Sequence, residues 1–452
     1  MIDKEIKTPK EVVEHLDKYI IGQDKAKKSV AIALRNRWRR KAAPPEIGRE
    51  ILPNNILMIG PTGVGKTEIA RRLAELSNAP FMKVEASKFT EIGYVGRDVE
   101  SMVRDLIELS VNMVKSEQAE KIAPKAEDNT NERLLDLLLP PSPKPKVVAG
   151  GTPEMQTGAI ESATREKFRQ KLLDGKLDDK QVELETPQDR FPTIEIFSPM
   201  GMEEMGMNFQ EMFSGIMPQK RKRRKMTIAE ARRYIYSEEI SKLVSTDDCV
   251  VEGLERAQES GIIFIDEIDK IAGSKSKTGP DVSREGVQRD ILPIIEGSAV
   301  MTKYGMVVTD HILFIAAGAF HISKPSDLVP ELQGRLPIRV ELDSLTAEDF
   351  FRILQEPRNA LIKQYTAMMA TEDVKLSFDK ASLKRIAEIA ELVNKSTENI
   401  GARRLHTVMS TLLEEIMFDA PNGKKSIKIN VAMVNKKLNQ YLENEDLSRY
   451  IL

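Results

Sequence analysis

One eight-residue segment constrains the fold of this 452-residue chain more than any other feature. GPTGVGKT, residues 60–67, directly follows the short apolar run NILMIG at 55–60 and precedes KTEIARRLAEL, whose apolar residues have helical spacing. Strand, glycine-rich loop and helix form the context in which G-x-x-x-x-G-K-[ST] cradles phosphates. Its glycines let backbone N–H groups converge on a phosphate, and the helix N-terminus adds a positive field. The segment therefore predicts an α/β domain with a nucleotide site.

The side chains of this segment suit the same chemistry. Lys66 is placed to reach the β- and γ-phosphates, and the hydroxyl of Thr67 is placed to ligate Mg²⁺. The alternative, a chance glycine turn, is disfavoured because every fixed position of the motif is filled in the expected context. We therefore expect ATP and Mg²⁺ as cofactors.

A second segment, IIFIDEID at 262–269, completes a hydrolytic site. Its four apolar residues predict a buried strand that carries Asp266 and Glu267 to its carboxyl end, where α/β proteins bind ligands. Asp266 suits Mg²⁺, and Glu267 suits the general base that activates water. Alone, the segment could equally be an acidic turn that caps a helix. Together, the two segments predict nucleotide hydrolysis.

The spacing of these segments indicates an insertion. Lys66 and Asp266 are 200 residues apart, far more than the one or two βαβ units of about 30 residues that normally separate such groups. The continuous apolar runs indicate a parallel sheet with helices on both faces. We predict a nucleotide-binding domain over 1–110 and 245–340, an inserted, mainly helical and partly flexible domain over 111–244, and a smaller α-rich domain over 341–452.

Further charged groups lie near predicted element ends. PELQGRLPIRV places Glu331 and Arg335 four residues apart before a strand, and ENIGARRL places Arg403 and Arg404 at a helix start. A guanidinium is the right group to stabilise charge on a transferring phosphoryl group, from the same chain or from a neighbour.

Composition excludes several classes of protein. A net charge of −2 and a pI near 6.3 provide no general attraction to nucleic acid or to anionic membranes. The single cysteine, Cys249, excludes an intramolecular disulfide framework, and no apolar run approaches the roughly 18 residues of a membrane span. With no secretory signal visible after Met1, we expect a cytoplasmic protein without membrane or nucleic-acid partners.

The motifs together resemble those of the AAA+ superfamily, and within it the Clp/Hsp100 family. The segments that carry the resemblance are IIGQ (20–23), GPTGVGKT, GYVG (93–96), FIDEID, GRLP and GAR, and the similarity covers nearly the whole chain. It implies an AAA+ P-loop domain interrupted by an inserted I domain, and a hexameric ATP-dependent unfoldase. Such a chaperone of the stress response would deliver unfolded or tagged proteins to a separate peptidase ring, because we find no peptidase site in this chain.

The resemblance also implies residue roles. Ile21 would pack on the adenine, and Glu331 and Arg335 would face the nucleotide of the next subunit, with Arg335 as arginine finger. Arg403 would sense nucleotide through the small domain. The phosphate cradle would comprise Gly63, Val64, Gly65, Lys66, Thr67 and Glu68. At the end of the strand LFIAAGAF, where many relatives place a polar sensor, this sequence offers alanines.

Two further segments are assigned to partners by the same resemblance. GYVG would form an axial pore loop in which Tyr94 and Val95 grip substrate and Gly93 and Gly96 act as hinges. The tail would insert into pockets of the peptidase ring as an apolar peptide with a free carboxylate. It comprises Leu447, Ser448, Arg449, Tyr450, Ile451 and Leu452. The alternatives are an ordinary loop and a tail docked on its own domain.

Two other functions remain open from sequence. The chain could be a nucleic-acid-remodelling motor, or a nucleotide-gated activator of a peptidase that performs no motor work. The basic segments LRNRWRR (34–40) and KRKRRK (220–225) would support the first. We interpret them instead as a helix face that is solvated or packs on a neighbouring subunit, and as an exposed, mobile charge run.

Overall fold

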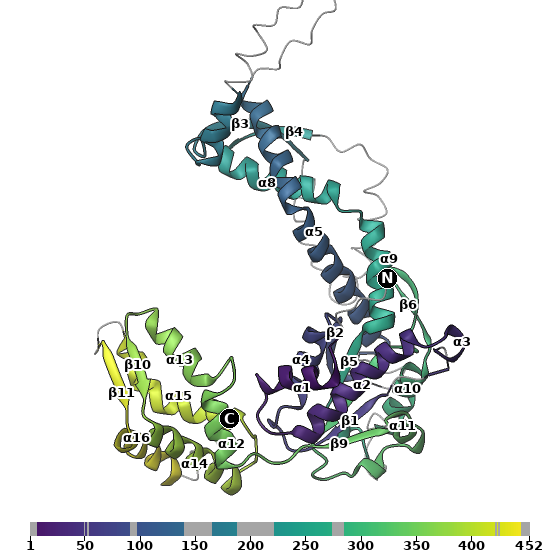
Figure 1. Ribbon diagram of the computed structural model, residues 1–452, viewed down its shortest axis with the longest axis vertical. Coiled ribbons are helices and arrows are strands. Elements are labelled where there is room, and N and C mark those ends of the chain that lie inside the picture. Colours follow the sequence, from purple (N-terminus) through teal and green to yellow (C-terminus); the bar gives the residue numbers. More distant parts are fainter. Residues whose placement is uncertain are drawn as a thin grey trace, which may run out of the picture. The chain divides into compact units, whose positions relative to one another are not determined.

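The structure is a computed structural model that describes residues 7–48, 50–51, 54–90, 97–139, 165–187, 221–273, 284–420, 423 and 425–443. The chain forms two compact units (Figure 1). One comprises residues 1–114 and 250–452, and the other comprises residues 115–249. Among the described residues, no helix is both long enough and apolar enough to cross a membrane.

A five-stranded parallel sheet organises the first unit. Its strand order is β2-β5-β8-β1-β9, and every neighbouring pair is parallel. The strands are β1 (Ile56–Ile59), β2 (Phe81–Glu85), β5 (Ile262–Asp266), β8 (Leu313–Gly318) and β9 (Ile338–Glu341). Both segments that predicted nucleotide chemistry therefore follow strands of one sheet, which confirms the predicted fold class.

Helices cover both faces of this sheet. Side chains of β5 alternate between two hydrophobic cores: Ile262 and Phe264 join one, and Ile263 and Ile265 join the other. The first core includes residues of α1 (Pro9–Asp17), α2 (Asp24–Ala42) and α4 (Lys66–Leu76). The second includes residues of α5 (Ser101–Leu138), α9 (Thr246–Ser260) and α10 (Arg284–Glu296). Burial on both faces explains the continuous apolar runs of the strands.

Short elements complete this part of the chain. They are α3 (Pro45–Gly48), the 3-10 turns η1 (Ala86–Lys88), η2 (Ile268–Lys270) and η3 (Pro325–Asp327), the antiparallel hairpin β6 (Ala299–Thr302) and β7 (Gly305–Val308), and α11 (Pro330–Arg335).

The C-terminal residues have a hydrophobic core of their own. It is built by α12 (Ala347–Gln355), α13 (Leu361–Ala370), α14 (Lys380–Ser396), α15 (Arg403–Phe418) and α16 (Val431–Glu443), with the parallel pair β10 (Lys375–Phe378) and β11 (Ser426–Ile429). We predicted a separate third domain over 341–452. That separate domain stays a prediction; in the structure these residues lie in the same compact unit as the sheet, and Ala402 N donates to Gly63 O.

The inserted unit covers 115–249, a few residues displaced from the predicted 111–244. It contains the end of α5, helical residues 165–173, α8 (Ile228–Leu243) and the antiparallel pair β3 (Gln181–Pro187) and β4 (Arg221–Thr227). Its core joins Leu134 of α5 to Leu184 of β3 and Ile235 of α8. The basic run at 221–225 was therefore wrongly interpreted as a mobile segment, since it is part of a strand.

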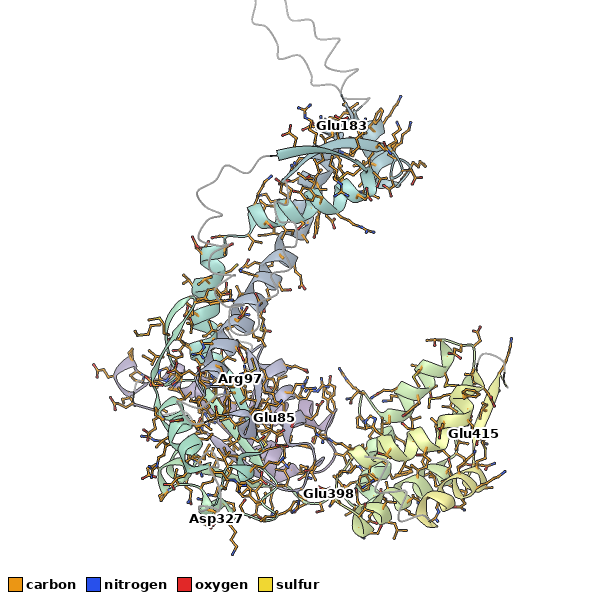
Figure 2. All side chains as sticks on the ribbon, turned by 180° about the vertical axis from the view of Figure 1, so that it is seen from behind. Glu85, Arg97, Glu183, Asp327, Glu398 and Glu415 are labelled. Atoms are coloured by element: carbon orange, nitrogen blue, oxygen red, sulfur yellow. The ribbon has the colours of Figure 1, made fainter. Side chains whose placement is uncertain are left out.

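Charge complementarity explains why a basic run pairs as a strand. Across the sheet, Arg223 Nε lies 3.1 Å from Glu185 Oε1, and Lys225 Nζ lies 3.5 Å from Glu183 Oε1. Glu183 is labelled in Figure 2. Opposite charges on facing positions stabilise antiparallel pairs. The sequence prediction failed because the acidic partner strand lies about 40 residues away in the chain.

The other basic segment, in α2, is partly buried rather than solvated. Arg37 donates to the carbonyl oxygens of Ser260 (2.9 Å), Gly261 (3.1 Å) and His311 (3.1 Å). Burial lowers the pKa of Arg37 to about 9. The guanidinium thus caps the end of α9 and the start of β5, so our interpretation of this face was wrong for Arg37.

Candidate functional site

The glycine-rich loop has the backbone geometry of a phosphate cradle. It connects β1 to α4, and Gly63 (φ +74°) and Gly65 (φ +105°) adopt left-handed conformations that side chains rarely allow. Gly65 immediately precedes the first residue of α4, and Val64 between the two glycines is buried. The loop can therefore present free amide groups at a helix N-terminus, which fits a nucleotide phosphate.

Lys66 supplies a buried cation at this loop. Its side chain is 8% exposed, and Nζ donates to the carbonyl oxygens of Gly60 and Pro61, the latter at 2.8 Å. Burial lowers the pKa of Lys66; Arg403 lowers it further, whereas Asp266 and Asp269 oppose the shift. A buried ammonium that donates to carbonyl oxygens is a suitable partner for an anionic ligand.

Thr67 and Asp266 come together although 199 positions separate them in the sequence. Thr67 Oγ1 lies 3.5 Å from Asp266 Oδ2, at the carboxyl ends of β1 and β5. A hydroxyl beside a carboxylate is the oxygen set that Mg²⁺ prefers, so these residues fit the ion. Asp266 Oδ2 also pairs with Lys83 Nζ at 2.9 Å. Lys83 was not predicted from the sequence, where its only signal is a charge inside the apolar strand PFMKVEA.

Glu267 lies in a strained position beside two donors. Its φ of +57° is unusual for a residue with a side chain. Its Oε2 atom pairs with Lys270 Nζ at 2.8 Å and accepts a hydrogen bond from Ser87 Oγ at 3.2 Å. Neither donor was identified from the sequence. Both lie on 3-10 turns, η2 and η1, which follow adjacent strands.

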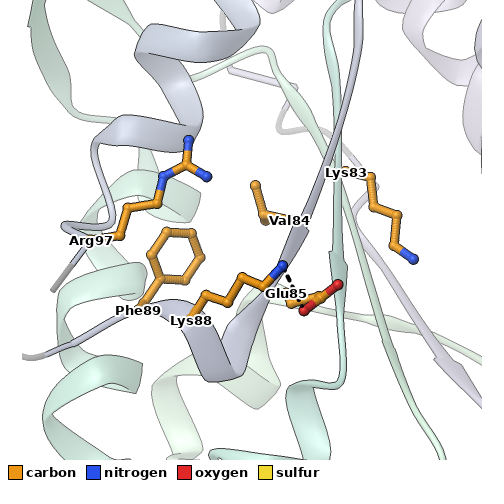
Figure 3. Close-up of a pocket in the computed structure, with 6 residues that line it drawn as sticks. All are labelled: Lys83, Val84, Glu85, Lys88, Phe89 and Arg97. Carbon is orange, nitrogen blue, oxygen red and sulfur yellow. Dashed lines mark ion pairs between the residues drawn. The ribbon is translucent and has the colours of Figure 1, made fainter.

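A small cavity lies beside η1 (Figure 3). Its volume is about 130 Å³, and it is lined by Lys83, Val84, Glu85, Lys88, Phe89 and Arg97, with Glu85 and Lys88 paired at 3.0 Å. A β-bridge between Phe89 and Arg97 brackets residues 90–96. The predicted pore-loop residues Gly93, Tyr94, Val95 and Gly96 lie outside the described residues, and so does the predicted tail, residues 447–452.

Glu331 and Arg335 are not brought to the phosphate loop. Both line a cavity of about 380 Å³ with Asn55, Glu296 and Pro337. Asn55 precedes β1 and Pro337 precedes β9, so this cavity lies at the amino edge of the sheet, one strand length of about 13 Å from the carboxyl edge. Arg335 Nε donates to Glu296 Oε1 at 3.0 Å. The structure thus separates two groups of candidate residues.

The IIGQ segment borders the phosphate loop. Ile21 is buried, and Ile20 Cγ2 would contact a side chain at Gly65 at 3.7 Å. Gln23 Nε2 donates to Asp343 O at 2.8 Å, and Gln23 Oε1 accepts from Asp343 N at 3.0 Å. Gln23 therefore links this segment to the chain after β9, a role that the sequence did not reveal. Glu68, predicted in the cradle, pairs with Arg72 at 2.8 Å.

The two neighbouring arginines at the start of α15 differ sharply. Arg403 is exposed and influences Lys66 electrostatically, whereas Arg404 is 2% exposed and bonds within its own domain. Ala402 N donates to Gly63 O at 3.0 Å, which joins this turn to the phosphate loop. At the end of β8, the alanines at 316 and 317 are buried, and no side chain there is suited to sense phosphate.

Comparison with known proteins agrees with this geometry. The family model of the ATPase family associated with various cellular activities (AAA) matches residues 56–170, and that of the AAA domain (Cdc48 subfamily) matches residues 190–339. The ATP-dependent protease ATPase subunit HslU of Thermotoga maritima is 55% identical over 98% of both chains. The corresponding proteins of Persephonella marina and Cytophaga hutchinsonii are each 56% identical over 98% of both chains.

Identity at this level, over nearly full length, confirms the resemblance seen in the motifs. The parallel sheet, the phosphate loop and the acidic pair after β5 are the parts expected of an ATPase of this class. The chain therefore belongs to the HslU family of AAA ATPases and is an ATP-binding, ATP-hydrolysing enzyme.

Proposed function

We propose that this chain is the ATP-driven unfoldase of a two-component cytoplasmic protease. In this proposal six copies form a ring that binds proteins, unfolds them and passes them to a separate HslV-type peptidase ring, which it activates. The name of the relatives, ATP-dependent protease ATPase subunit, supports a protease partner. The placement of Arg335 supports the ring.

The observation that carries the ring is the distance between the two edges of the sheet. Arg335 lies at the amino edge, whereas Lys66, Asp266 and Glu267 lie at the carboxyl edge. A guanidinium on a side chain of about 7 Å cannot cross a strand of about 13 Å to its own phosphate loop. Arg335 therefore acts on the nucleotide of a neighbouring subunit, together with Glu331, and each site needs two copies of the chain.

Within one subunit, the residues at the carboxyl edge divide the work of hydrolysis. Lys66 exchanges its carbonyl partners for phosphate oxygens, and Thr67 and Asp266 hold Mg²⁺. Bound Mg²⁺ would screen the phosphate charge. Glu267 has one oxygen engaged by Ser87 and Lys270, and it accepts the proton of the attacking water. Ile21 packs on the adenine, and Arg403 senses the nucleotide from the small domain.

The predicted domains take the remaining roles. The nucleotide domain and the α-rich C-terminal region change their relative angle with nucleotide state, and the inserted I domain contacts incoming proteins. Tyr94 and Val95 grip substrate in the axial channel between the hinges Gly93 and Gly96. Residues 447–452 dock into the peptidase ring.

The decisive experiment combines the purified chain, an HslV-type peptidase, ATP and two substrates, a folded protein and a short peptide. We expect both substrates to be cleaved with ATP. The Glu267→Gln variant should lose cleavage of the folded protein and retain stimulation of peptide cleavage. Deletion of 447–452 should abolish both while basal ATPase survives.

Two outcomes would contradict the proposal. Full degradation of the folded protein by Glu267→Gln would leave only a nucleotide-gated activator without motor work. Failure to stimulate the peptidase, combined with DNA-stimulated ATPase that weakens steeply with salt, would favour a nucleic-acid motor.

A further inference from the structure

Two glycine turns from distant parts of the sequence interlock at the nucleotide site. An ideal Cβ on Gly63 of the phosphate loop would lie 2.0 Å from Ile400 O, and one on Gly401 would lie 2.5 Å from Thr62 O. Gly401 has a φ of +58°, and Ala402 N donates to Gly63 O at 3.0 Å. Backbone meets backbone here, so any movement of residues 397–402, which we call the clasp loop, is transmitted to the phosphate loop.

A buried asparagine on α14 holds the end of the clasp loop. Asn394 is 7% exposed, and its Nδ2 donates to Gly401 O at 3.1 Å. Its Oδ1 accepts from Ile400 N at 3.3 Å and from Arg404 Nε at 3.2 Å. The side-chain amide of Asn394 thus bonds to Ile400 N and to Gly401 O. Ile400 and Gly401 are also the residues that approach Gly63 and Thr62.

A buried arginine holds the beginning of the same loop. Arg404 Nη2 donates to Thr397 Oγ1 at 2.9 Å and to Glu398 O at 3.0 Å; Glu398 is labelled in Figure 2. Together, Asn394 and Arg404 bond both ends of a six-residue loop. Buried polar networks of this kind are costly to disrupt, because removing one member leaves the others unpaired.

The burial of Arg404 also determines where Arg403 points. Consecutive helical residues project about 100° apart, so an inward Arg404 leaves its neighbour on a different face. Arg403 is exposed. Burial is the main cause of the lowered pKa of Lys66, and the positive charge of Arg403 lowers it further. The same network therefore sets the position of the clasp loop and the direction of the arginine beside it.

We propose that Asn394 and Arg404 are positioning residues for ATP binding. They hold the clasp loop against Gly63, keep the phosphate loop in its cradle conformation and direct Arg403 towards the phosphates. The inference rests on the proposed role of residues 63–67 as the phosphate cradle. Both side chains bond to the clasp loop, so both act on the phosphate loop through it.

The test compares ATPase kinetics of three variants of the full chain. Asn394→Leu removes three hydrogen bonds at similar volume, and we expect the KM for ATP to rise by about tenfold or more with a smaller change in kcat. Asn394→Asp keeps an acceptor for Ile400 N and Arg404 Nε but replaces the donor to Gly401 O with a carboxylate oxygen, so we expect a rise in KM smaller than that of Asn394→Leu. Asn435→Leu is the matched control, because Asn435 Oδ1 binds Arg385 Nε at 2.8 Å elsewhere in the same region.

A fourth variant keeps the test decisive if Asn394→Leu does not fold. Gly401→Ala leaves Asn394 and Arg404 in place but forces a methyl group against Thr62 O. We expect the same rise in KM, and the double variant Asn394→Leu/Gly401→Ala should be no worse than the more affected single variant. A normal KM in either single variant, or an equal rise in Asn435→Leu, would overturn the inference.

Lys66→Met separates this inference from the proposed site. If Lys66→Met binds ATP normally, the assignment of the phosphate cradle fails. If Lys66→Met loses ATP while Asn394→Leu and Gly401→Ala retain a normal KM, only the positioning role of Asn394 and Arg404 is excluded.

Discussion

The two edges of the parallel sheet carry candidate residues in very different states of assembly. At the carboxyl edge, Thr67 contacts Asp266, and Glu267 is held by Ser87 and Lys270, all within one chain. At the amino edge, Arg335 has only Glu296 as a side-chain partner among the bonds of the described residues, and it lines an open cavity. At the carboxyl edge the candidate residues contact partners within one chain, whereas at the amino edge the guanidinium of Arg335 faces an open cavity.

This difference indicates which candidate residues the folding of one chain brings together and which it leaves apart. In the sheet only β8 lies between β1 and β5. The acidic pair and the phosphate loop, which follow these two strands, therefore lie close together in every folded chain. Arg335 is held away from that loop by the length of the strands themselves. Four variants test this contrast.

The largest effect is expected at the amino edge. Arg335→Ala should lower ATPase activity by about 10³-fold, because a finger stabilises charge that develops only in the transition state. Mixing Arg335→Ala with Glu267→Gln subunits should restore part of the activity, since some interfaces then combine an intact finger with an intact base. Arg339→Ala, which removes an exposed arginine bonded to Gln333, is the matched control. No recovery on mixing would place Arg335 in its own subunit's site.

A somewhat smaller effect is expected at the carboxyl edge. Glu267→Gln should lower kcat by about 10²-fold or more and leave ATP binding intact, because the amide cannot accept the proton of water. Glu85→Gln is the control, as Glu85 lies at the same edge and forms an ion pair with Lys88 at 3.0 Å. Single-turnover kinetics measure the hydrolytic step, and equilibrium binding measures the affinity for ATP. Unimpaired turnover by Glu267→Gln would exclude this residue as the base.

Loss of the ion pair between Glu296 and Arg335 should lower ATPase activity less than loss of Arg335 or Glu267. Glu296 and Arg335 are each more than one-third exposed, and such ion pairs contribute at most about 1 kcal/mol. Glu296→Gln should therefore change ATPase activity by no more than about fivefold, whereas Arg335→Ala nearly abolishes it. A loss as large as that of Arg335→Ala would mean that Glu296 is itself part of the neighbouring site.

The smallest effect on ATPase is expected at Tyr94, which follows η1 in the sequence. Tyr94→Ala should retain ATP hydrolysis and the oligomeric state but lose degradation of folded proteins, because the aromatic side chain grips substrate rather than nucleotide. Size-exclusion chromatography and ATPase assays check the first two properties, and a folded fluorescent substrate checks the third. Equal degradation by Tyr94→Ala would show that this segment is an ordinary loop.

Local sequence patterns revealed the carboxyl edge well. Gly63 to Thr67 and Asp266–Glu267 were identified because each motif is short and its strand context is visible in the neighbouring apolar residues. Lys83, Ser87 and Lys270 were missed because each binds through a contact that depends on strand order or on a turn. The strand β4 was missed because its acidic partner lies far away in the sequence.

Local sequence patterns were enough to predict the α/β class, the phosphate loop, the acidic pair and the insertion between them, because periodicity and glycine spacing are local properties of the chain. Three other features became visible only in the folded chain: Arg403 is exposed while Arg404 is buried, Asn394 holds the clasp loop, and Arg335 lies at the opposite edge of the sheet. These features depend on which strands and helices pack together. Two adjacent arginines such as Arg403 and Arg404 have the same chemistry, so the sequence does not indicate which of them is buried.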